Sequence, residues 1–317
     1  MGTYIIRRLL AMIPMMFVIT FIIYLALELT PGDAVSHLIP PDAMANVSRE
    51  QLEVLREEYG LNDPFIIRYF NWIGRVIKGD FGYSVSSGVA ISEIIFNNLG
   101  PTVQLAVASL VISSVLGSIF GLISALKKGS FADNTLSVAG MIGVSIPQFF
   151  FAITCVVYLV LKLGWFPIRI LPHQQSVFSD IKVLLLPAMI LGISQTAAVM
   201  RYTRAGMLSV MNKDFVKTAR SKGLSETRVN LIHGFRVALT PVVVLIGFRL
   251  PTLISGSVVI ETIFQRKGIG VTFVTAVRGQ NYPLVMMIAL FLVMAVLAAS
   301  LLVDICTALL DPRVKLG

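Results

Sequence analysis

Six apolar segments organise the chain, and each is long enough to cross a bilayer as a helix. They lie at about residues 9–30, 101–126, 135–163, 183–203, 240–262 and 284–310. A spanning helix needs roughly 20 mostly apolar residues. The first segment follows Arg7 and Arg8 as in a signal peptide, but it exceeds the roughly 7–15 apolar residues typical of one, so we expect it to be retained. The pattern predicts an all-α polytopic membrane protein with six transmembrane helices.

The charges between these segments predict how the helices are oriented, because Lys and Arg favour cytoplasmic loops. Arg7 and Arg8 precede the first segment, and Lys127 and Lys128 join the second to the third. Residues 201–236 hold eight Lys and Arg, whereas residues 31–100 hold nine acidic against five basic residues. Six spans with both termini in the cytoplasm satisfy every loop. The chain then divides into an N-terminal tip with the first helix (1–30), an external loop (31–100) and a five-helix core (101–317).

The external loop predicts short amphipathic helices. Ser48 with Gln51 forms a capping box for one helix, and Asp63 is expected to cap another whose first turn holds Pro64. The apolar residues of this second helix share one side and are Phe65, Tyr69, Trp72 and Val76. Such a helix either lies at the membrane interface, where Trp and Tyr are favoured, or packs as a lid on the spans.

The inner connection, residues 204–239, predicts a helical hairpin. Asp214 to Lys222 suits a short helix, Gly223 supplies the break, and Ser225 caps a second helix that stops at Pro241. A topological anchor needs only a few basic residues, so the length of this segment favours a docking surface for another protein. The residues expected on that surface are Asp214, Lys217, Thr218, Ala219, Arg220, Lys222, Gly223 and Leu224.

Composition and motifs argue against an enzyme. Hydrophobic residues make up 56% of the chain and charged residues only 14%, against about 25% charged in soluble proteins. The dipeptide Gly-Lys is absent, so the chain has no phosphate-binding loop. The three histidines are far apart and lack neighbouring cysteines, which disfavours a zinc site. We therefore expect no catalytic residue, metal or cofactor on this chain, and no nucleic-acid partner, because the net charge of +9 lies in the loops.

A few polar and special residues fall inside the spans, where charges are costly and often functional. Arg249 and Asp304 lie at similar depth, roughly 10–12 Å from the inner boundary, and are candidates for an ion pair. Whether that pair is purely structural or part of a substrate path stays open. The candidates for lining a path are Gln148, Gln195, Arg249, Ser255 and Glu261. Kinks are expected at Pro147, Pro187 and Pro251, and close helix contacts at Gly117, Gly121, Gly140 and Gly143.

Several strings in a fixed order resemble the B-type permease subunits of dipeptide and oligopeptide ABC importers. They include Pro31-Gly32-Asp33-Ala34, Tyr59-Gly60-Leu61-Asn62-Asp63-Pro64, Gly79-Asp80-Phe81-Gly82, Thr218-Ala219-Arg220-Ser221-Lys222-Gly223-Leu224, Gly268-Ile269-Gly270 and Leu310-Asp311-Pro312-Arg313. The hairpin string resembles the family's EAA loop, with Lys217-Thr218-Ala219 where the general pattern has Glu-Ala-Ala. Lys267 stands where a proline is common, and Asn281 where an aspartate is common.

The resemblance implies a type I ABC importer fold, with a five-helix core preceded by an extra helix, in the cytoplasmic membrane of a bacterium or archaeon. It also implies a second homologous permease, two ATPase subunits that bind ATP and Mg²⁺, and an external substrate-binding protein. The transported solute would be a di- or oligopeptide. The alternatives are a nickel complex, glutathione or an oligosaccharide, or a secondary transporter, which would be expected to show internal repeats.

Overall fold

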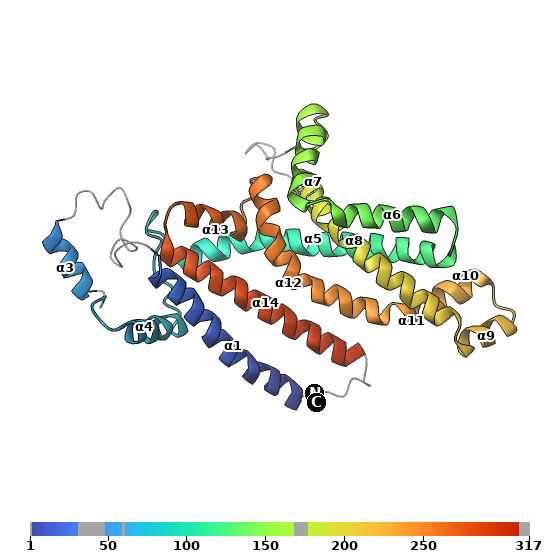
Figure 1. Cartoon of the computed structure of the whole chain (residues 1–317), viewed down its shortest axis with the longest axis horizontal. Coiled ribbons are helices and arrows are strands. Elements are labelled where there is room, and N and C mark those ends of the chain that lie inside the picture. Colours follow the sequence, from blue (N-terminus) through green and yellow to red (C-terminus); the bar gives the residue numbers. More distant parts are fainter. Residues whose placement is uncertain (1, 31–47, 59–60, 168–176, 311–317) are drawn as a thin grey trace. The chain divides into compact units, whose positions relative to one another are not determined.

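A computed structural model of the chain describes residues 2–30, 48–58, 61–167 and 177–310 (Figure 1). Helices dominate these residues, and within them strand-like pairing is confined to an isolated bridge between Tyr83 and Ala90. The chain forms two compact units. Among the described residues, one unit comprises 103–167, 177–266 and 298–310, and the other comprises 2–30, 48–58, 61–102 and 267–297.

The long helices are close to those predicted. By length and composition, four can cross a membrane: α1 (Gly2–Glu28), α5 (Ile91–Leu126), α8 (Val177–Met211) and α14 (Tyr282–Leu310). Two bent helix pairs raise the number to six if each pair is one span. The first pair joins α6 (Phe131–Ser145) to α7 (Gln148–Cys155) and the π-helix η2 (Val156–Lys162), and the second runs into α12 (Thr240–Ile263).

The third predicted segment is broken rather than kinked. Helix α6 ends at Ser145, Ile146 is extended (φ −78°, ψ 122°), and Pro147 precedes α7. The two halves are bent by 97°. Proline disfavours helical backbone at the residue before it and has no N–H to donate, so Ile146-Pro147 interrupts the helix. The kink predicted at Pro147 is therefore confirmed and is a full break, so residues 135–163 form one span only if the two halves count as one.

Glycines allow α8 to approach its neighbours in the first unit. A Cβ at Gly117 of α5 would come within 2.5 Å of the Val199 side chain, and one at Gly121 within 2.6 Å of the Met200 carbonyl oxygen. Gly140 of α6 faces Ala197 at an ordinary 3.5 Å. The prediction of close contacts holds for Gly117 and Gly121. It is wrong for Gly143, where a Cβ would meet no atom within 4 Å.

In the second unit, aromatic side chains join α1 to the amphipathic helix α4 (Phe65–Ile77). The ring of Phe21 makes edge contacts with Phe65 at 5.6 Å and with Tyr69 at 5.4 Å between centroids. The hydroxyls of Tyr69 and Thr20 share a hydrogen bond of 2.9 Å. This packed face agrees with the lid alternative. A neighbouring side of the helix exposes Ile66, Phe70 and Ile77, so α4 also keeps an apolar face of the kind expected at an interface.

Of the two N-terminal caps predicted in the external loop, one is confirmed and the other is wrong. The capping box is confirmed before α3 (Arg49–Glu58): Ser48 N–H donates to Gln51 Oε1 at 2.9 Å, and Gln51 N–H donates to Ser48 Oγ at 3.3 Å. The cap expected at Asp63 is wrong, because Pro64 occupies the N-cap of α4 and no side chain caps that helix. The short helix α13 (Ile269–Arg278) completes this unit.

Candidate functional site

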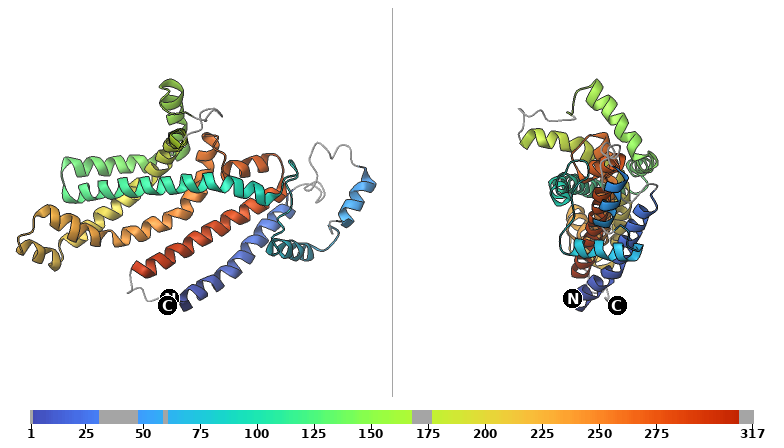
Figure 2. Two further views of the ribbon diagram at one scale, coloured as in Figure 1. Left: turned by 180° about the vertical axis from the view of Figure 1, so that it is seen from behind. Right: turned by 90° about the vertical axis from the view of Figure 1, so that its left-hand side faces the viewer.

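The hairpin between α8 and α12 has the predicted outline. Helix α9 (Asp214–Ser221) is followed by a turn, and the return arm consists of α10 (Glu226–Arg228), the π-helix η4 (Val229–Phe235) and α11 (Arg236–Ala238). Figure 2 shows the hairpin extending past the ends of α5 and α6. Ser225 occupies the N-cap of α10 as expected but makes no side-chain capping bond. The π-helical turn was not predicted.

The turn depends on Gly223. Its φ is +75°, a left-handed backbone conformation that residues other than Gly and Asn rarely adopt. Its N–H donates to the Arg220 carbonyl at 2.9 Å. Across the turn, Arg220 Nε and Nη2 donate to the two carboxylate oxygens of Glu226 at 2.8 and 3.2 Å. The left-handed backbone at Gly223 sets the direction of the return arm, and this exposed ion pair spans the turn.

The inner face of the hairpin is apolar and attaches it to the spans. Val216 and Val229 are fully buried. They belong to a cluster with Ala125 of α5 and with Met207 and Val210 of α8. A backbone contact adds to this packing, because a Cβ at Gly206 would lie 2.9 Å from the Ala238 carbonyl oxygen. The hairpin is therefore packed onto α5 and α8 and is expected to move together with them.

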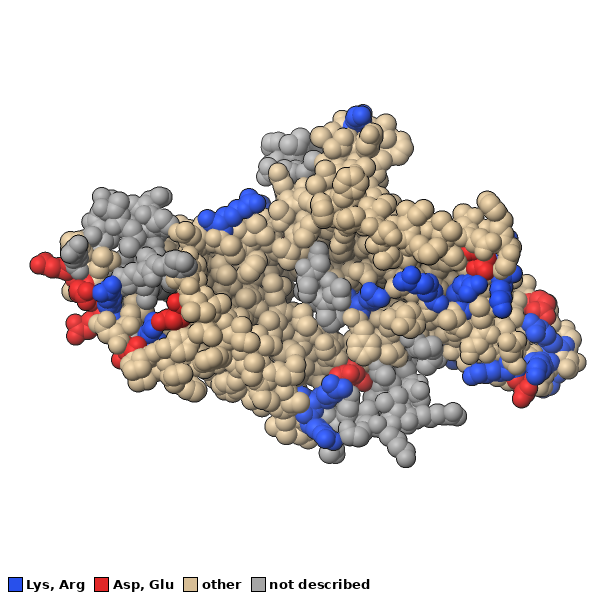
Figure 3. All heavy atoms as spheres, in the orientation of Figure 1, with Lys and Arg blue, Asp and Glu red and all other residues tan. Residues whose placement is uncertain are grey.

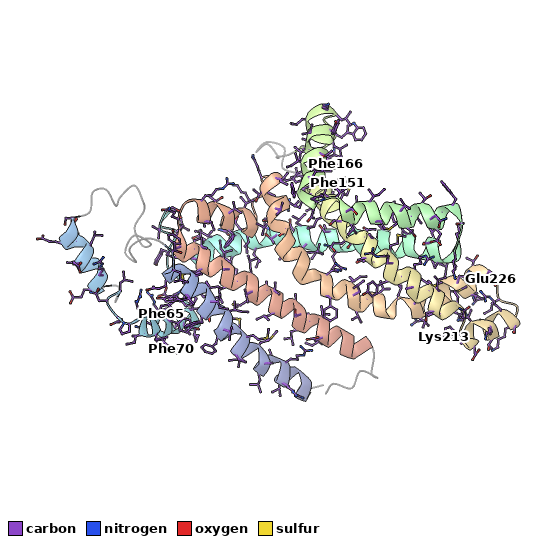
Figure 4. All side chains as sticks on the ribbon, in the orientation of Figure 1. Phe65, Phe70, Phe151, Phe166, Lys213 and Glu226 are labelled. Atoms are coloured by element: carbon purple, nitrogen blue, oxygen red, sulfur yellow. The ribbon has the colours of Figure 1, made fainter. Side chains whose placement is uncertain are left out.

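The outer face, which we call the docking face, is basic and exposed. Figure 3 shows Lys and Arg gathered over the hairpin, and Figure 4 labels Lys213 and Glu226 there. Among the predicted residues, Asp214 and Lys217 pair with each other at 3.0 Å, Leu224 packs partly inward, and Ala219 is buried in the inner cluster. The exposed residues of this face include Lys213, Asp214, Phe215, Lys217, Thr218, Arg220, Lys222, Glu226 and Arg228. Phe215 is 41% exposed and was missed as a candidate, although an apolar residue among charges was visible in the sequence.

A buried ion pair lies at the base of the hairpin. Asp133 of α6 is 3% exposed and accepts hydrogen bonds from Arg204 Nε and Nη2 of α8 at 2.9 and 2.8 Å. Ser124 Oγ of α5 and the Gly129 N–H also donate to this carboxylate, the latter at 2.9 Å. The network links α5, α6 and α8 with every acceptor lone pair engaged. Sequence reasoning counted Arg204 only as a basic loop residue, although Asp133 follows the N-cap Ser130 at a helix start.

Of the predicted path residues, the structure brings two together. Arg249 Nη1 of α12 donates to Gln195 Oε1 of α8 at 2.8 Å, and within the described chain Arg249 forms no salt bridge. The expected pair with Asp304 is thus not formed here. Gly247 faces α14, since a Cβ there would lie 2.9 Å from Val303 Cγ2. Arg249 is two residues further along, about 200° around the helix, so it lies on the side of α12 away from Val303. The pairing stays a prediction for another conformation.

The other candidates lie apart from this contact. Gln148 opens α7 after the break, and its Nε2 is buried with no hydrogen-bond partner in the described structure. Glu261 is fully buried near the end of α12, so it lines no open surface in this conformation. Ser255 lies in α12, and its side chain falls outside the described residues. No group of three or more metal-ligating side chains occurs among the described residues.

Family models match nearly the whole chain. Residues 117–316 match the "binding-protein-dependent transport system inner membrane component" model, and residues 1–106 match the N-terminal domain model of the same systems. The hairpin, Asp133, Arg204 and Arg249 all lie in the first of these regions.

Full-length relatives are also similar. The "oligopeptide transport system permease protein AppB" of Bacillus subtilis is 37% identical, over 99% of this chain and 100% of its own. A "putative peptide permease protein" of Brucella ovis is 34% identical over 98% of both chains.

A solved structure shares the fold over about two thirds of the chain. The methionine ABC transporter MetNI, in inward-facing form, matches 69% of this chain and 97% of its own with a TM-score of 0.55 at 15% identity. At this identity the match shows the fold alone, which is that of an ABC importer membrane subunit.

Proposed function

The chain belongs to the inner-membrane components of binding-protein-dependent transport systems, and from that premise we propose that it forms the translocation path for peptides in an ATP-driven importer. Membership makes it a multi-pass permease subunit and not an enzyme. The substrates are di- or oligopeptides delivered by an external binding protein. What supports this class is the naming of full-length relatives as oligopeptide and peptide permeases, at 34–37% identity.

The importer also contains a second, homologous permease and two ATPase subunits. ATP and Mg²⁺ bind to those ATPase subunits, while this chain binds no cofactor. In the orientation that the basic loops favour, both termini and the hairpin face the cytoplasm, and the acidic segment 31–100 faces outward.

The docking face couples ATP hydrolysis to the path. Phe215 offers an apolar anchor among Lys213, Lys217 and Lys222, a combination suited to an acidic-rimmed groove on a partner protein. Movement of a partner bound there is transmitted to α8 and α5, because the apolar cluster and the Gly206–Ala238 contact fix the hairpin to them. The observation that carries the coupling role is this combination of an exposed basic outer face with a rigidly packed inner face.

Substitution of Gly223 tests the coupling role. Gly223→Val places a β-branched residue at φ +75°, which costs about 1–2 kcal/mol and misplaces Lys222 and Leu224. Gly223→Asn is the matched control, because Asn tolerates this conformation. We would measure uptake of a labelled peptide and co-purification of the ATPase subunits, at matched membrane abundance.

The Val variant is expected to lose uptake and ATPase binding together, while the Asn variant keeps both. Full uptake and full ATPase binding by Gly223→Val would overturn the coupling role. Absence of peptide uptake by the wild-type importer, with ATPase binding intact, would overturn the peptide substrate alone.

A further inference from the structure

Arg249 carries a full positive charge within α12, a mostly apolar helix whose other ionisable side chain, Glu261, lies near its C-terminal end. Arg249 lies about eleven residues from the Ala238–Gly206 contact, and Gln195 lies at the same separation from Gly206 on α8. Measured from the span ends predicted from the sequence, Arg249 and Gln195 each lie about 12 Å from the inner boundary, inside a hydrocarbon layer about 30 Å thick. A side chain at this depth is too far from either surface to place its charge among lipid headgroups.

The bonding of this arginine is incomplete in the described structure. A guanidinium has five N–H donors, and the one hydrogen bond formed goes to a neutral amide, Gln195 Oε1. Arg204, on the same helix bundle, instead meets both oxygens of a carboxylate. A charge in a span with one neutral partner is costly to keep, and such residues mark binding sites more often than packing.

The surroundings also decide what could satisfy the remaining donors. Gly247 and Val303 show that one side of α12 is closed against α14. Arg249 projects to the other side, toward α8, where Gln195 is half-buried. The planar guanidinium of arginine can donate two parallel hydrogen bonds to a carboxylate. The NH₂ group of Gln195 is a further hydrogen-bond donor, which a carboxylate could also accept.

We infer that Arg249, oriented by Gln195, binds a carboxylate of the solute in transit, and that for a peptide this is its C-terminal carboxylate. The inference rests on the proposed peptide function and adds the chemical group that the path recognises. A single arginine with one neutral neighbour binds an anion weakly enough to release it, as a translocation path requires.

The test compares one peptide in two forms. Tri-alanine with a free C-terminus and its C-terminal amide are supplied to the complete importer, and initial uptake rates are measured at matched membrane abundance. The variants are Arg249→Met, which keeps bulk and removes charge, and Arg249→Lys, which keeps charge without the fork. Lys182→Met is the control, because it removes one exposed positive charge of α8 away from this contact. The binding protein is the same in every assay, so its own preference cancels when variants are compared.

We expect Arg249→Met to lower the ratio of free-acid to amide uptake about tenfold and to leave amide uptake near the wild-type rate. Arg249→Lys should retain part of the preference, and Lys182→Met all of it. An unchanged ratio, or equal loss of both forms in Arg249→Met, would overturn the carboxylate role while leaving the peptide function standing. If the wild-type importer takes up neither form, the peptide function fails and this inference with it.

Discussion

Two arginines in the same unit of the fold have opposite environments. Arg204 donates to both oxygens of Asp133, and Ser124 and Gly129 complete the coordination of that carboxylate. Arg249 donates once, to the neutral side chain of Gln195. Both lie on helices that contact each other, and residue type alone does not distinguish the surroundings of the two arginines.

The difference separates structure from function. A carboxylate on α6 that receives four hydrogen bonds from α8, α5 and a turn has no capacity left for a ligand, so the Asp133–Arg204 network stabilises the base of the hairpin. A guanidinium with one neutral partner has capacity left and lies within the span. Each prediction below changes one of these environments, or adds a third arginine as reference.

The largest expected effect follows from Asp133→Ala. It leaves the Arg204 guanidinium, the Ser124 hydroxyl and the Gly129 N–H without their acceptor, and removal of one partner of a buried ion pair is strongly destabilising. We expect permease abundance in membranes to fall several-fold and its protease sensitivity to rise. The double variant Asp133→Ala, Arg204→Met should recover part of the abundance, because it removes the unpaired charge. Wild-type abundance of the single variant would show that the network is dispensable.

A smaller effect on uptake, with little on stability, is expected for Gln195→Glu. The new carboxylate lies within reach of Arg249 and converts its environment to that of Arg204. We expect uptake of a free-acid peptide to fall several-fold, because the substrate carboxylate now competes with an internal one. Uptake of the amidated peptide is the internal control and should change little. Equal or faster uptake of the free acid would contradict a competition at Arg249.

The smallest effect on stability is expected for Arg220→Gln. Arg220 also forms a bidentate pair, with Glu226, but its side chain is 38% exposed and that of Glu226 is 63% exposed. Exposed pairs contribute about 0–1 kcal/mol. The melting temperature of the purified importer should therefore change little, in contrast to Asp133→Ala. A loss of abundance equal to that of Asp133→Ala would mean that bonding geometry, and not burial, sets the contribution of these arginines.

The hairpin illustrates how much of the site was predictable. A glycine between two helical patterns is a local signal for a turn, and Gly223 forms that turn with a left-handed φ of +75°. The π-helical turn over Val229–Phe235 has no such local signal in the sequence. Phe215 required knowledge of which face of α9 is covered, and Asp133 required a partner 71 residues away in the chain.

The sequence by itself determined the positions of the apolar segments, the position of the basic hairpin and its glycine turn. These features depend on hydrophobic length and on local backbone preference, both of which act over a few neighbouring residues. Only the tertiary structure decided which polar side chains meet. Arg249 contacts Gln195 because Gly247 turns the opposite side of α12 toward Val303. Arg204 reaches Asp133 because Gly117 and Gly121 bring α5 against α8, on which α6 also packs. Such pairings depend on how close helix backbones come and on the rotation of each helix about its axis, and hydrophobic length leaves both undetermined.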